Sequence, residues 1–207
     1  MERWKVRWKE RPGPGNARRR RCLFALALAA WAPLPMPMCA LAHGKLGSVT
    51  PARPVPGGLT VWYQGRRTLL RELLLGKTSA VQLMFAGCSS ICPVQGAMFA
   101  AVQAELDAFP DLQLLSLSID ALGDDDAALA SWQRRFAAQS RWRAAALEPP
   151  GLAVFNEMVG APTDNPAGHS TAVYFFDADA SLAWRTNDLP GAREVAATLR
   201  RLHRPGK

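Results

Sequence analysis

The stretch AVQLMFAGCSSICPVQGAM, residues 80–98, joins a short apolar run to two cysteines and then to a helical pattern. The apolar run AVQLMF lies between polar residues and Gly87, which is typical of a buried central strand. After the cysteines, apolar residues recur at spacings of three and four, so we expect a helix from about Pro93 to Ala108. Cys88 and Cys92 therefore lie in a loop that leads from a buried strand into a helix.

The pattern of the remaining chain extends this strand–helix unit in both directions. The further elements we expect are a hairpin and one helical turn in residues 59–74, a buried strand at 112–119, a helix from Asp124 to about Gln139, a strand at 142–147, a short helix closed by Gly160, two strands around a turn at 177–180, and a final helix at 191–202. This order predicts an α/β, thioredoxin-like sandwich with a central mixed β-sheet flanked by helices.

The positive charge of the chain lies in its N-terminal segment. The formal net charge is +8, but residues 1–42 hold nine Lys and Arg against two Glu. The residues from His43 onward hold sixteen basic and fifteen acidic side chains, so this part is close to neutral. A nearly neutral domain gives no electrostatic footprint for nucleic acid, and we exclude nucleic acid as a partner.

The N-terminal segment has the organisation of an export signal. Residues 1–42 are predicted to be a basic leader with a secretory signal peptide, because arginines precede an apolar run, a proline-rich neck and small residues, with cleavage after Ala42. The apolar run before Pro33 is short for a membrane-spanning helix, so a retained anchor is the second choice. Residues 43–58 are predicted to be an extended linker and residues 59–207 the folded domain.

Removal of the leader would leave one pair of cysteines. Cys22 and Cys39 would leave with the signal peptide, and Cys88 and Cys92 would remain. In an oxidising compartment, two such thiols usually form a disulfide or bind a metal ion. Proline is favoured at the first position of a helix, and Pro93 directly follows Cys92. We therefore expect Cys92 at or just before the N-cap, where the helix dipole favours a thiolate.

The spacing of the cysteines leaves both a redox role and a metal role open. Three residues separate the thiols, whereas the common dithiol oxidoreductase motif has two. Two thiolates can hold Cu(I), and a third soft or imidazole ligand would allow either oxidation state of copper, while zinc would want a fourth protein ligand. His169 ends a long loop and is the candidate for a third ligand, whereas His203, in a basic tail, is most simply a solvated residue at a helix end.

Three motifs in one order resemble the Sco/SenC family of copper-binding, thioredoxin-fold proteins. They are MFAGCSSICP at 84–93, LSLSID at 115–120 and GHSTAVYFFDADA at 168–180. The resemblance covers about residues 59–203. It implies that Cys88, Cys92 and His169 are the copper ligands.

The resemblance also assigns two acidic residues and reveals two departures. Asp120 and Asp124 match acidic positions of the family and are possible accessory residues in copper handling or partner recognition. Ala121 stands where the family usually has proline, and Gly168 where it has aspartate before the histidine. Loss of that aspartate would remove a group that orients the imidazole, so the chain resembles a divergent member.

The resemblance implies an exported copper metallochaperone, in the periplasm or at the outer face of the cytoplasmic membrane. Its cargo would be Cu(I) or Cu(II), and its partner would be the subunit that holds the dinuclear copper centre of cytochrome c oxidase. Other periplasmic copper chaperones or thiol–disulfide reductants are further possible partners. The alternative function is a thiol–disulfide oxidoreductase that keeps the cysteines of such a copper site reduced, using Cys88 and Cys92. A peroxiredoxin-like peroxidase is a weaker third interpretation, because the threonine and arginine that such enzymes use are not evident near the cysteines.

Overall fold

The computed structural model describes residues 46–160 and 170–203, and the predicted leader lies outside them. Its elements, in chain order, are β1 (Leu46–Pro54), β2 (Thr60–Tyr63), β3 (Arg66–Leu69), α1 (Leu70–Leu74), β4 (Thr78–Met84), α2 (Ile91–Gln103), β5 (Leu112–Ser118), α3 (Asp126–Arg135), β6 (Trp142–Leu147), α4 (Pro149–Val159), β7 (Val173–Phe176), β8 (Ser181–Thr186) and α5 (Ala192–Leu202). Within these residues, no helix has the length and apolar character needed to cross a membrane.

The strands of the described residues form one mixed sheet in the order β1-β8-β7-β4-β5-β6-β2-β3. β4, β5 and β6 are parallel to one another, and β7 pairs antiparallel with β4 on its other side. Every residue of β4 and β5 is buried, as the continuous apolar runs predicted. The parallel strands run in the centre of the sheet, so their carboxyl ends place the following loops at one edge.

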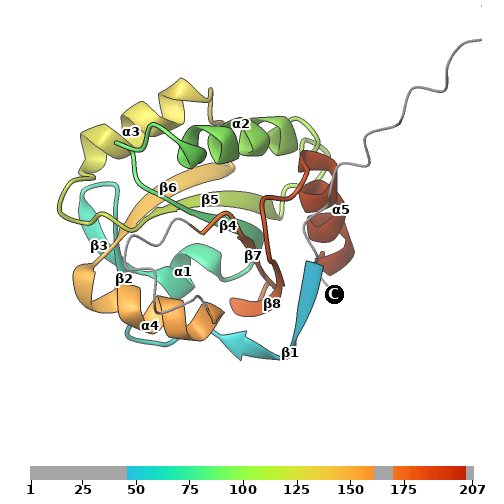
Figure 1. The fold of residues 1–207 in the computed structure, drawn as a ribbon. Helices are drawn as coiled ribbons and strands as arrows, with labels where there is room; N and C mark the ends of the chain where they lie inside the picture. Colours follow the sequence, from blue (N-terminus) through green and yellow to red (C-terminus); the bar gives the residue numbers. More distant parts are fainter. Residues whose placement is uncertain (1–45, 161–169, 204–207) are drawn as a thin grey trace, which may run out of the picture. The chain divides into compact units, whose positions relative to one another are not determined.

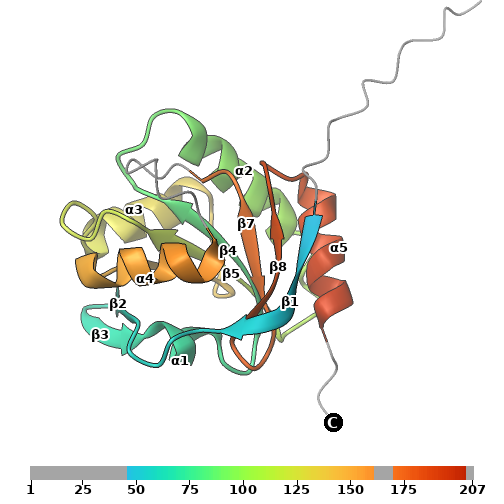
Figure 2. The same cartoon turned by 60° about the horizontal axis from the view of Figure 1, so that its bottom comes forward.

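Helices cover both faces of this sheet (Figures 1 and 2). α1 and α4 pack on one face, where Leu70 and Phe155 join a core cluster with residues of β4 and β5. α2 and α5 pack on the opposite face through Phe99 and Leu199, and α3 covers the same face farther along. The predicted α/β sandwich with a central mixed sheet and flanking helices is therefore confirmed.

The predicted hairpin is present and its turn explains its sequence. β2 and β3 pair antiparallel with Tyr63 opposite Arg66. The two residues between them, Gln64 and Gly65, have φ values of 50° and 75°. Two successive positive φ values define the turn that matches strand twist in a two-residue hairpin, and glycine adopts this conformation without strain.

The sheet begins earlier in the chain than predicted. Residues 43–58 were expected to be a linker, but Leu46–Pro54 forms β1 and pairs with β8. β1 is an edge strand, so its prolines need no ladder hydrogen bonds on the outer side, and its register shifts between Ser48 and Arg53. The prolines that suggested a linker are thus compatible with an edge strand.

Two helices end before the residues at which the sequence pattern would end them. α2 ends at Gln103 rather than near Ala108, because the chain turns tightly through hydrogen bonds to residues three positions earlier, such as Leu106 N to Gln103 O at 3.1 Å. α3 ends at Arg135 rather than near Gln139. The predicted end of α4 is confirmed, since Gly160 caps it with φ of 63°.

Candidate metal and redox site

The cysteines lie where the first parallel strand meets the first long helix. β4 ends at Met84, and a turn closed by the Cys88 N to Phe85 O hydrogen bond of 3.1 Å leads to Ser90, the N-cap residue of α2. The Ser90 side chain makes no capping hydrogen bond with the helix backbone. It contacts Cys88 instead, with 3.5 Å between Oγ and Sγ.

Cys92 lies further into the helix than predicted. α2 begins at Ile91, so Cys92 is its second residue and not at or before the N-cap. Pro93, expected at the first helical position, is the third residue of α2. Proline is tolerated there because the first four backbone N–H groups of a helix have no acceptor within the helix.

Both thiols are buried and unoxidised. Cys88 is 4% exposed and Cys92 is 1% exposed, and neither forms a disulfide. They belong to a small apolar cluster with Met84 of β4 and with Leu129 and Trp132 of α3. α3 therefore covers the thiols from the side opposite the sheet.

The environment of Cys88 favours its thiolate. Burial raises the pKa of Cys88, but hydrogen bonds from the Ser90 hydroxyl, the Cys92 thiol and the backbone amides of Cys92 and Ser90 outweigh it. Together they lower this pKa from 9.0 to about 6. The start of the helix therefore favours a thiolate on Cys88 and not on Cys92, where the sequence analysis expected it, because the Cys88 sulfur accepts from the backbone amides of Cys92 and Ser90.

Cys92 has the opposite tendency. Burial, the hydrogen bond to Cys88 and the charge on Cys88 raise the pKa of Cys92 to about 12, although a backbone hydrogen bond from Phe85 opposes this. The pair therefore consists of one thiolate and one thiol that share a hydrogen bond. Two adjacent sulfurs of this kind can hold a soft metal ion or can exchange with a disulfide.

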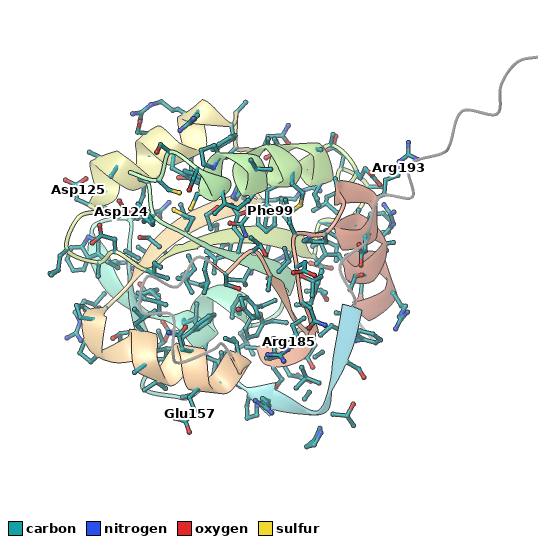
Figure 3. The ribbon with its side chains drawn as sticks, in the orientation of Figure 1. Phe99, Asp124, Asp125, Glu157, Arg185 and Arg193 are labelled. Carbon is teal, nitrogen blue, oxygen red and sulfur yellow. The ribbon has the colours of Figure 1, made fainter. Side chains whose placement is uncertain are left out.

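Asp124 fastens the loop before Cys88 to the neighbouring strand. Its carboxylate oxygen Oδ2 accepts hydrogen bonds from the Ala86 amide at 2.7 Å and from the Ser118 hydroxyl at 2.6 Å. The residue is 5% exposed, next to the exposed Asp125, which caps α3 by accepting from the Ala128 amide (Figure 3). Asp124 therefore stabilises the loop that carries Cys88.

Asp120 organises the turn between β5 and α3. Its carboxylate accepts from the Gly123 amide at 2.9 Å, and its backbone carbonyl accepts from the Asp124 amide at 2.8 Å. The side chain is exposed, and with Ala86, Gly87 and Trp132 it lines a cavity of about 440 Å³ beside the cysteine loop. Asp120 and Asp124 thus border the site, and within the described residues their hydrogen bonds go to backbone amides and to Ser118.

His169 and Gly168, the third predicted ligand and its neighbour, lie outside the described residues. Within residues 46–160 and 170–203, no three His, Cys, Asp or Glu side chains are grouped so that they could hold a metal ion. The next residue, Ser170, is described, and its carbonyl accepts a hydrogen bond of 3.1 Å from Gln95 of α2. His203, at the C-cap of α5, packs edge-on against the Phe109 ring.

Reasoning from sequence missed Ser90 and Gln95. Ser90 lies between the cysteines, and its spacing of two from Cys88 gave no sign that its hydroxyl would contact the sulfur. Gln95 follows Cys92 by three positions, a spacing that places two residues on one helix face and was the available signal.

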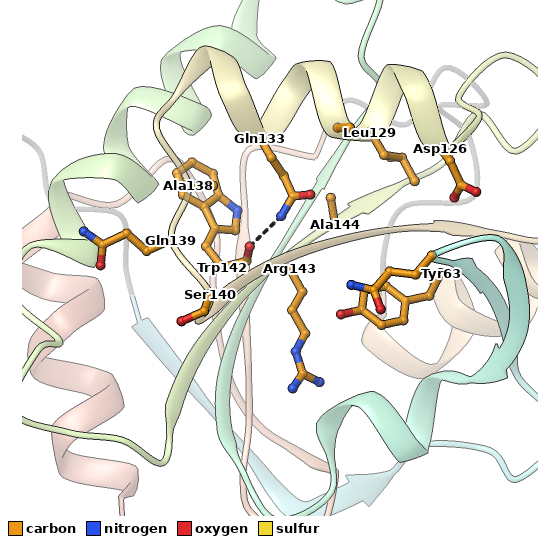
Figure 4. A pocket seen from close by; sticks show the side chains of 12 residues that line it. Tyr63, Asp126, Leu129, Gln133, Ala138, Gln139, Ser140, Trp142, Arg143 and Ala144 are labelled. Carbon is orange, nitrogen blue, oxygen red and sulfur yellow. Dashed lines mark hydrogen bonds between the residues drawn. The ribbon is translucent and has the colours of Figure 1, made fainter.

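Another cavity lies away from the cysteines (Figure 4). It has a volume of about 460 Å³ between α3, β6 and the β2–β3 hairpin, and Tyr63, Asp126 and Arg143 are among its lining residues. Gln133 crosses it to donate to the Trp142 carbonyl at 2.7 Å. The described residues that line it include no cysteine or histidine, and both cysteines lie at the start of α2.

Comparison with known proteins bears on this arrangement. The SCO1/SenC family model matches residues 63–143, which include both cysteines, Asp120 and Asp124. None of the curated proteins compared with the chain matches it.

Solved structures share the fold at low sequence identity. A SCO1/SenC family lipoprotein from Bacillus anthracis is 19% identical, with 78% of this chain and 96% of that one covered and a TM-score of 0.59. Copper-bound ScoI from Bradyrhizobium japonicum is 19% identical, with 71% and 99% covered and a TM-score of 0.57. BsSco, described as a Sco-family cytochrome c oxidase assembly protein with a disulfide switch, is 19% identical, with 72% and 92% covered and a TM-score of 0.59.

Proposed function

We propose that the chain, whose residues 63–143 match the SCO1/SenC family model, is a member of that family and an exported copper metallochaperone. It binds one copper ion through Cys88, Cys92 and His169. It then passes the ion to a respiratory copper enzyme. The recipient site is the dinuclear copper centre of cytochrome c oxidase. The proposal extends to this chain what is known of its similar structures, one of which holds copper and another of which belongs to the oxidase assembly proteins.

One observation supports the ligand set more than any other. Two adjacent buried sulfurs, one of them with its pKa lowered to about 6, lie at the start of α2. Gln95 of the same helix donates a hydrogen bond to the carbonyl of Ser170, and Ser170 follows His169 in the chain. Thiolates are soft ligands that suit Cu(I), and an added imidazole suits Cu(II) as well, so this donor set fits copper in both oxidation states.

Transfer requires ligand exchange and no covalent chemistry. Cys88, already favoured as the thiolate, binds first, and Cys92 loses its proton when copper replaces the hydrogen bond between the sulfurs. Release is the reverse, as thiolates of the partner replace the three ligands one at a time. Asp124 keeps the Cys88 loop in place during this exchange through its bond to Ala86.

Copper titration tests this function. We expect the purified wild-type protein to bind one Cu(I) per chain under anaerobic competition, and Cys88→Ser and Cys92→Ser to lose that binding. His169→Ala is expected to bind more weakly and to lose the Cu(II) spectrum. His203→Ala is the matched control, because His203 packs on Phe109 at the end of α5, and it should behave as the wild type. A wild-type protein that binds no copper would contradict the proposal.

The second candidate function is a thiol–disulfide oxidoreductase, and the unequal pKa values of the two thiols favour it. The Cys88 thiolate would attack a disulfide sulfur of the partner, form a mixed disulfide and release one partner thiolate. Cys92 would then lose its proton and attack Cys88, releasing the second partner thiolate and leaving a Cys88–Cys92 disulfide. An external dithiol would reduce this disulfide and return both cysteines to the thiol state.

His169→Ala separates the two functions. A chaperone loses its Cu(II) site in this variant, whereas an oxidoreductase keeps its rate of disulfide exchange.

We also propose that the protein acts in the periplasm or at the outer face of the cytoplasmic membrane. A similar structure is a lipoprotein by description, and a mature N-terminus at His43, measured by mass spectrometry of the exported protein, would support cleavage after Ala42.

A further inference from the structure

The Trp132 ring lies between the two cysteine sulfurs and a cavity at the surface. Trp132 of α3 belongs to the apolar cluster that contains Cys88 and Cys92. It also lines the cavity of about 440 Å³ beside the cysteine loop, together with Ala86 and Gly87, and the described residues that line this cavity include neither cysteine. A reactant that approaches the sulfurs through the cavity therefore meets the Trp132 ring first.

Chemistry at the sulfurs requires that a covering group move. Cys88 is 4% exposed, Cys92 is 1% exposed and Trp132 is 2% exposed. Exchange of a ligand or of a disulfide needs direct approach of a partner's sulfur to these atoms or to an ion that they hold. The sheet lies beneath the sulfurs and α2 carries them, so α3 with Trp132 is the cover whose displacement opens a path from the cavity.

Trp132 has one hydrogen bond that fixes the orientation of its ring. Its indole Nε1 donates to the Ser116 hydroxyl at 3.0 Å. An indole has a single donor and no acceptor, so this bond uses the only polar group of the side chain. The Phe136 ring supports Trp132 from within α3 and the turn that follows it, with 4.8 Å between the ring centroids. Apolar contacts of this kind restrain rotation of a ring less than a directional bond does.

The position of the Ser116 oxygen is set by the centre of the sheet. Ser116 lies in β5, opposite Gln82 of β4 and Ala144 of β6, and it is 0% exposed. Nε2 of Gln82 donates to the same oxygen at 2.8 Å, and the indole Nε1 of Trp142 donates to it at 2.9 Å. Trp132 is thus connected to an atom that three strands hold in place.

We propose that Trp132 controls access to Cys88 and Cys92 and that Ser116 is the positioning residue that keeps its ring over the sulfurs. When the bond between Trp132 and Ser116 breaks, the ring turns toward the cavity and a partner's sulfur can enter. This inference goes beyond the proposed function, because it applies to ligand exchange and to disulfide exchange alike.

Trp142 provides a matched control. It is also buried, with 1% exposed, and its indole donates to the same Ser116 oxygen at nearly the same distance. It belongs to the core cluster under α2 and α5 and not to the cluster of the cysteines. Trp132→Phe and Trp142→Phe therefore lose the same kind of bond and the same ring area, and only the first changes the cover of the sulfurs. Ser116→Ala keeps the Trp132 ring and removes its acceptor.

The first measurement uses the full chain without copper. Alkylation of Cys88 by iodoacetamide is followed at pH 8, above its pKa of about 6, so that the rate reports access to the sulfur and not its protonation. We expect the rate to rise at least about 10-fold in Trp132→Phe and in Ser116→Ala, and to stay within about 2-fold of the wild type in Trp142→Phe. Mass spectrometry of the labelled peptide measures each rate.

The same rates in dilute urea separate a local opening from a loss of global stability. A local movement of one ring exposes little new surface, so its rate should be almost independent of urea below the unfolding transition. Unfolding of the whole domain gives a rate that increases steeply with urea. Wild-type rates in both Trp132→Phe and Ser116→Ala would overturn the role of Trp132. An equal increase in Trp142→Phe, or an increase that follows urea, would overturn it as well, and Ser116→Ala decides the question if Trp132→Phe does not fold.

The second measurement follows Cu(I) on the full chain. Trp132 is not a ligand, so Trp132→Phe should accelerate both loading of Cu(I) and its removal by an excess of chelator by about 10-fold, and leave the Kd within about 3-fold of the wild type. A weaker Kd with an unchanged rate of loading would contradict control of access. A wild-type protein that binds no copper would refute the proposed copper function, and the alkylation rates would still decide the role of Trp132.

Discussion

The two cysteines differ although they are neighbours, and the difference comes from single contacts. Both sulfurs belong to the apolar cluster under α3, but Cys88 accepts hydrogen bonds from Ser90, from the Cys92 thiol and from the amides of Cys92 and Ser90, whereas burial and the neighbouring Cys88 dominate at Cys92. The thiolate of the pair is therefore on Cys88. This asymmetry could not be derived from the sequence, because it depends on how far Cys92 enters the helix.

Alkylation should distinguish the two sulfurs. The pKa of Cys88 is lowered to about 6, so its thiolate is depleted below that pH and predominates above it. Its rate of reaction with a small alkylating reagent should therefore rise with a midpoint near pH 6 and then level off, while Cys92 stays unreactive up to pH 9, about three units below its own pKa. Mass spectrometry of the labelled peptides measures both rates. A midpoint for Cys88 near its ordinary pKa would contradict the assignment, and Ser90→Ala should move the midpoint upward.

The two aspartates differ in their contributions to stability. In the wild type, one carboxylate oxygen of Asp124 accepts hydrogen bonds from the Ala86 amide and the Ser118 hydroxyl. Asp124→Asn weakens both bonds, because a neutral amide oxygen is a poorer acceptor than a carboxylate oxygen. We expect a loss of about 1–3 kcal/mol in the free energy of unfolding, measured by urea denaturation. Asp120→Asn is the control, since the exposed asparagine can still accept from the Gly123 amide, and its effect should stay within about 0.5 kcal/mol. Equal effects of the two substitutions would contradict a supporting role for Asp124.

At the scale of the elements, sequence periodicity predicted which segments form helices and strands better than where they end. The β2–β3 hairpin, the buried strands β4 and β5 and the glycine cap of α4 follow from local patterns. The end of α2 does not, because apolar residues continue past Gln103 in a tight turn. Apolar side chains such as Leu106 fill the same core from a turn as they would from a helix, so their spacing cannot separate the two conformations.

The contact between α2 and the end of α3 depends on a glycine. A Cβ atom added at Gly96 would overlap the Phe136 ring, which also packs at 4.8 Å from the Trp132 ring that covers the thiols. Gly96→Ala should therefore destabilise the protein by about 1–3 kcal/mol, despite the better helix propensity of alanine. Gly57→Ala, where nothing lies within 4 Å of the added atom, is the control and should change stability by less than about 0.5 kcal/mol.

A double variant shows whether that cost comes from the ring. If the overlap with Phe136 is responsible, Gly96→Ala combined with Phe136→Leu should cost less than the sum of the two single substitutions. Additive losses in thermal unfolding would refute the proposed contact.

At the scale of the whole molecule, the fold was predictable and the site only in part. The α/β sandwich follows from the order of the elements, and the motifs place Cys88 and Cys92 at the end of the first buried strand. The extent of the sheet was underestimated, because the prolines of residues 46–54 hid an edge strand. Gln95 and Ser90 could not be assigned, since their roles arise from contacts with Ser170 and with a sulfur that only the folded chain creates.

Binding of copper should stabilise the folded domain as a unit. A ligand that binds the native state alone adds about 2.7 kcal/mol at a free concentration 100 times its Kd. We therefore expect anaerobic Cu(I) to raise the Tm of the wild type and a competing chelator to reverse the increase. Cys88→Ser should show no increase, and an unchanged Tm of the wild type across the titration would contradict a site formed by the native fold.

The two outer strands of the sheet have a further consequence for how partners meet this protein. β1 at one edge contains Pro51 and Pro54, and β3 at the other edge exposes Arg66 and Arg67. Prolines and charged side chains discourage the addition of a foreign strand, which is the usual route of edge-to-edge aggregation. We therefore expect a partner protein to bind at neither edge strand. The loops at the carboxyl ends of the parallel strands, where the two cysteines lie, are the surface that remains for a transient complex.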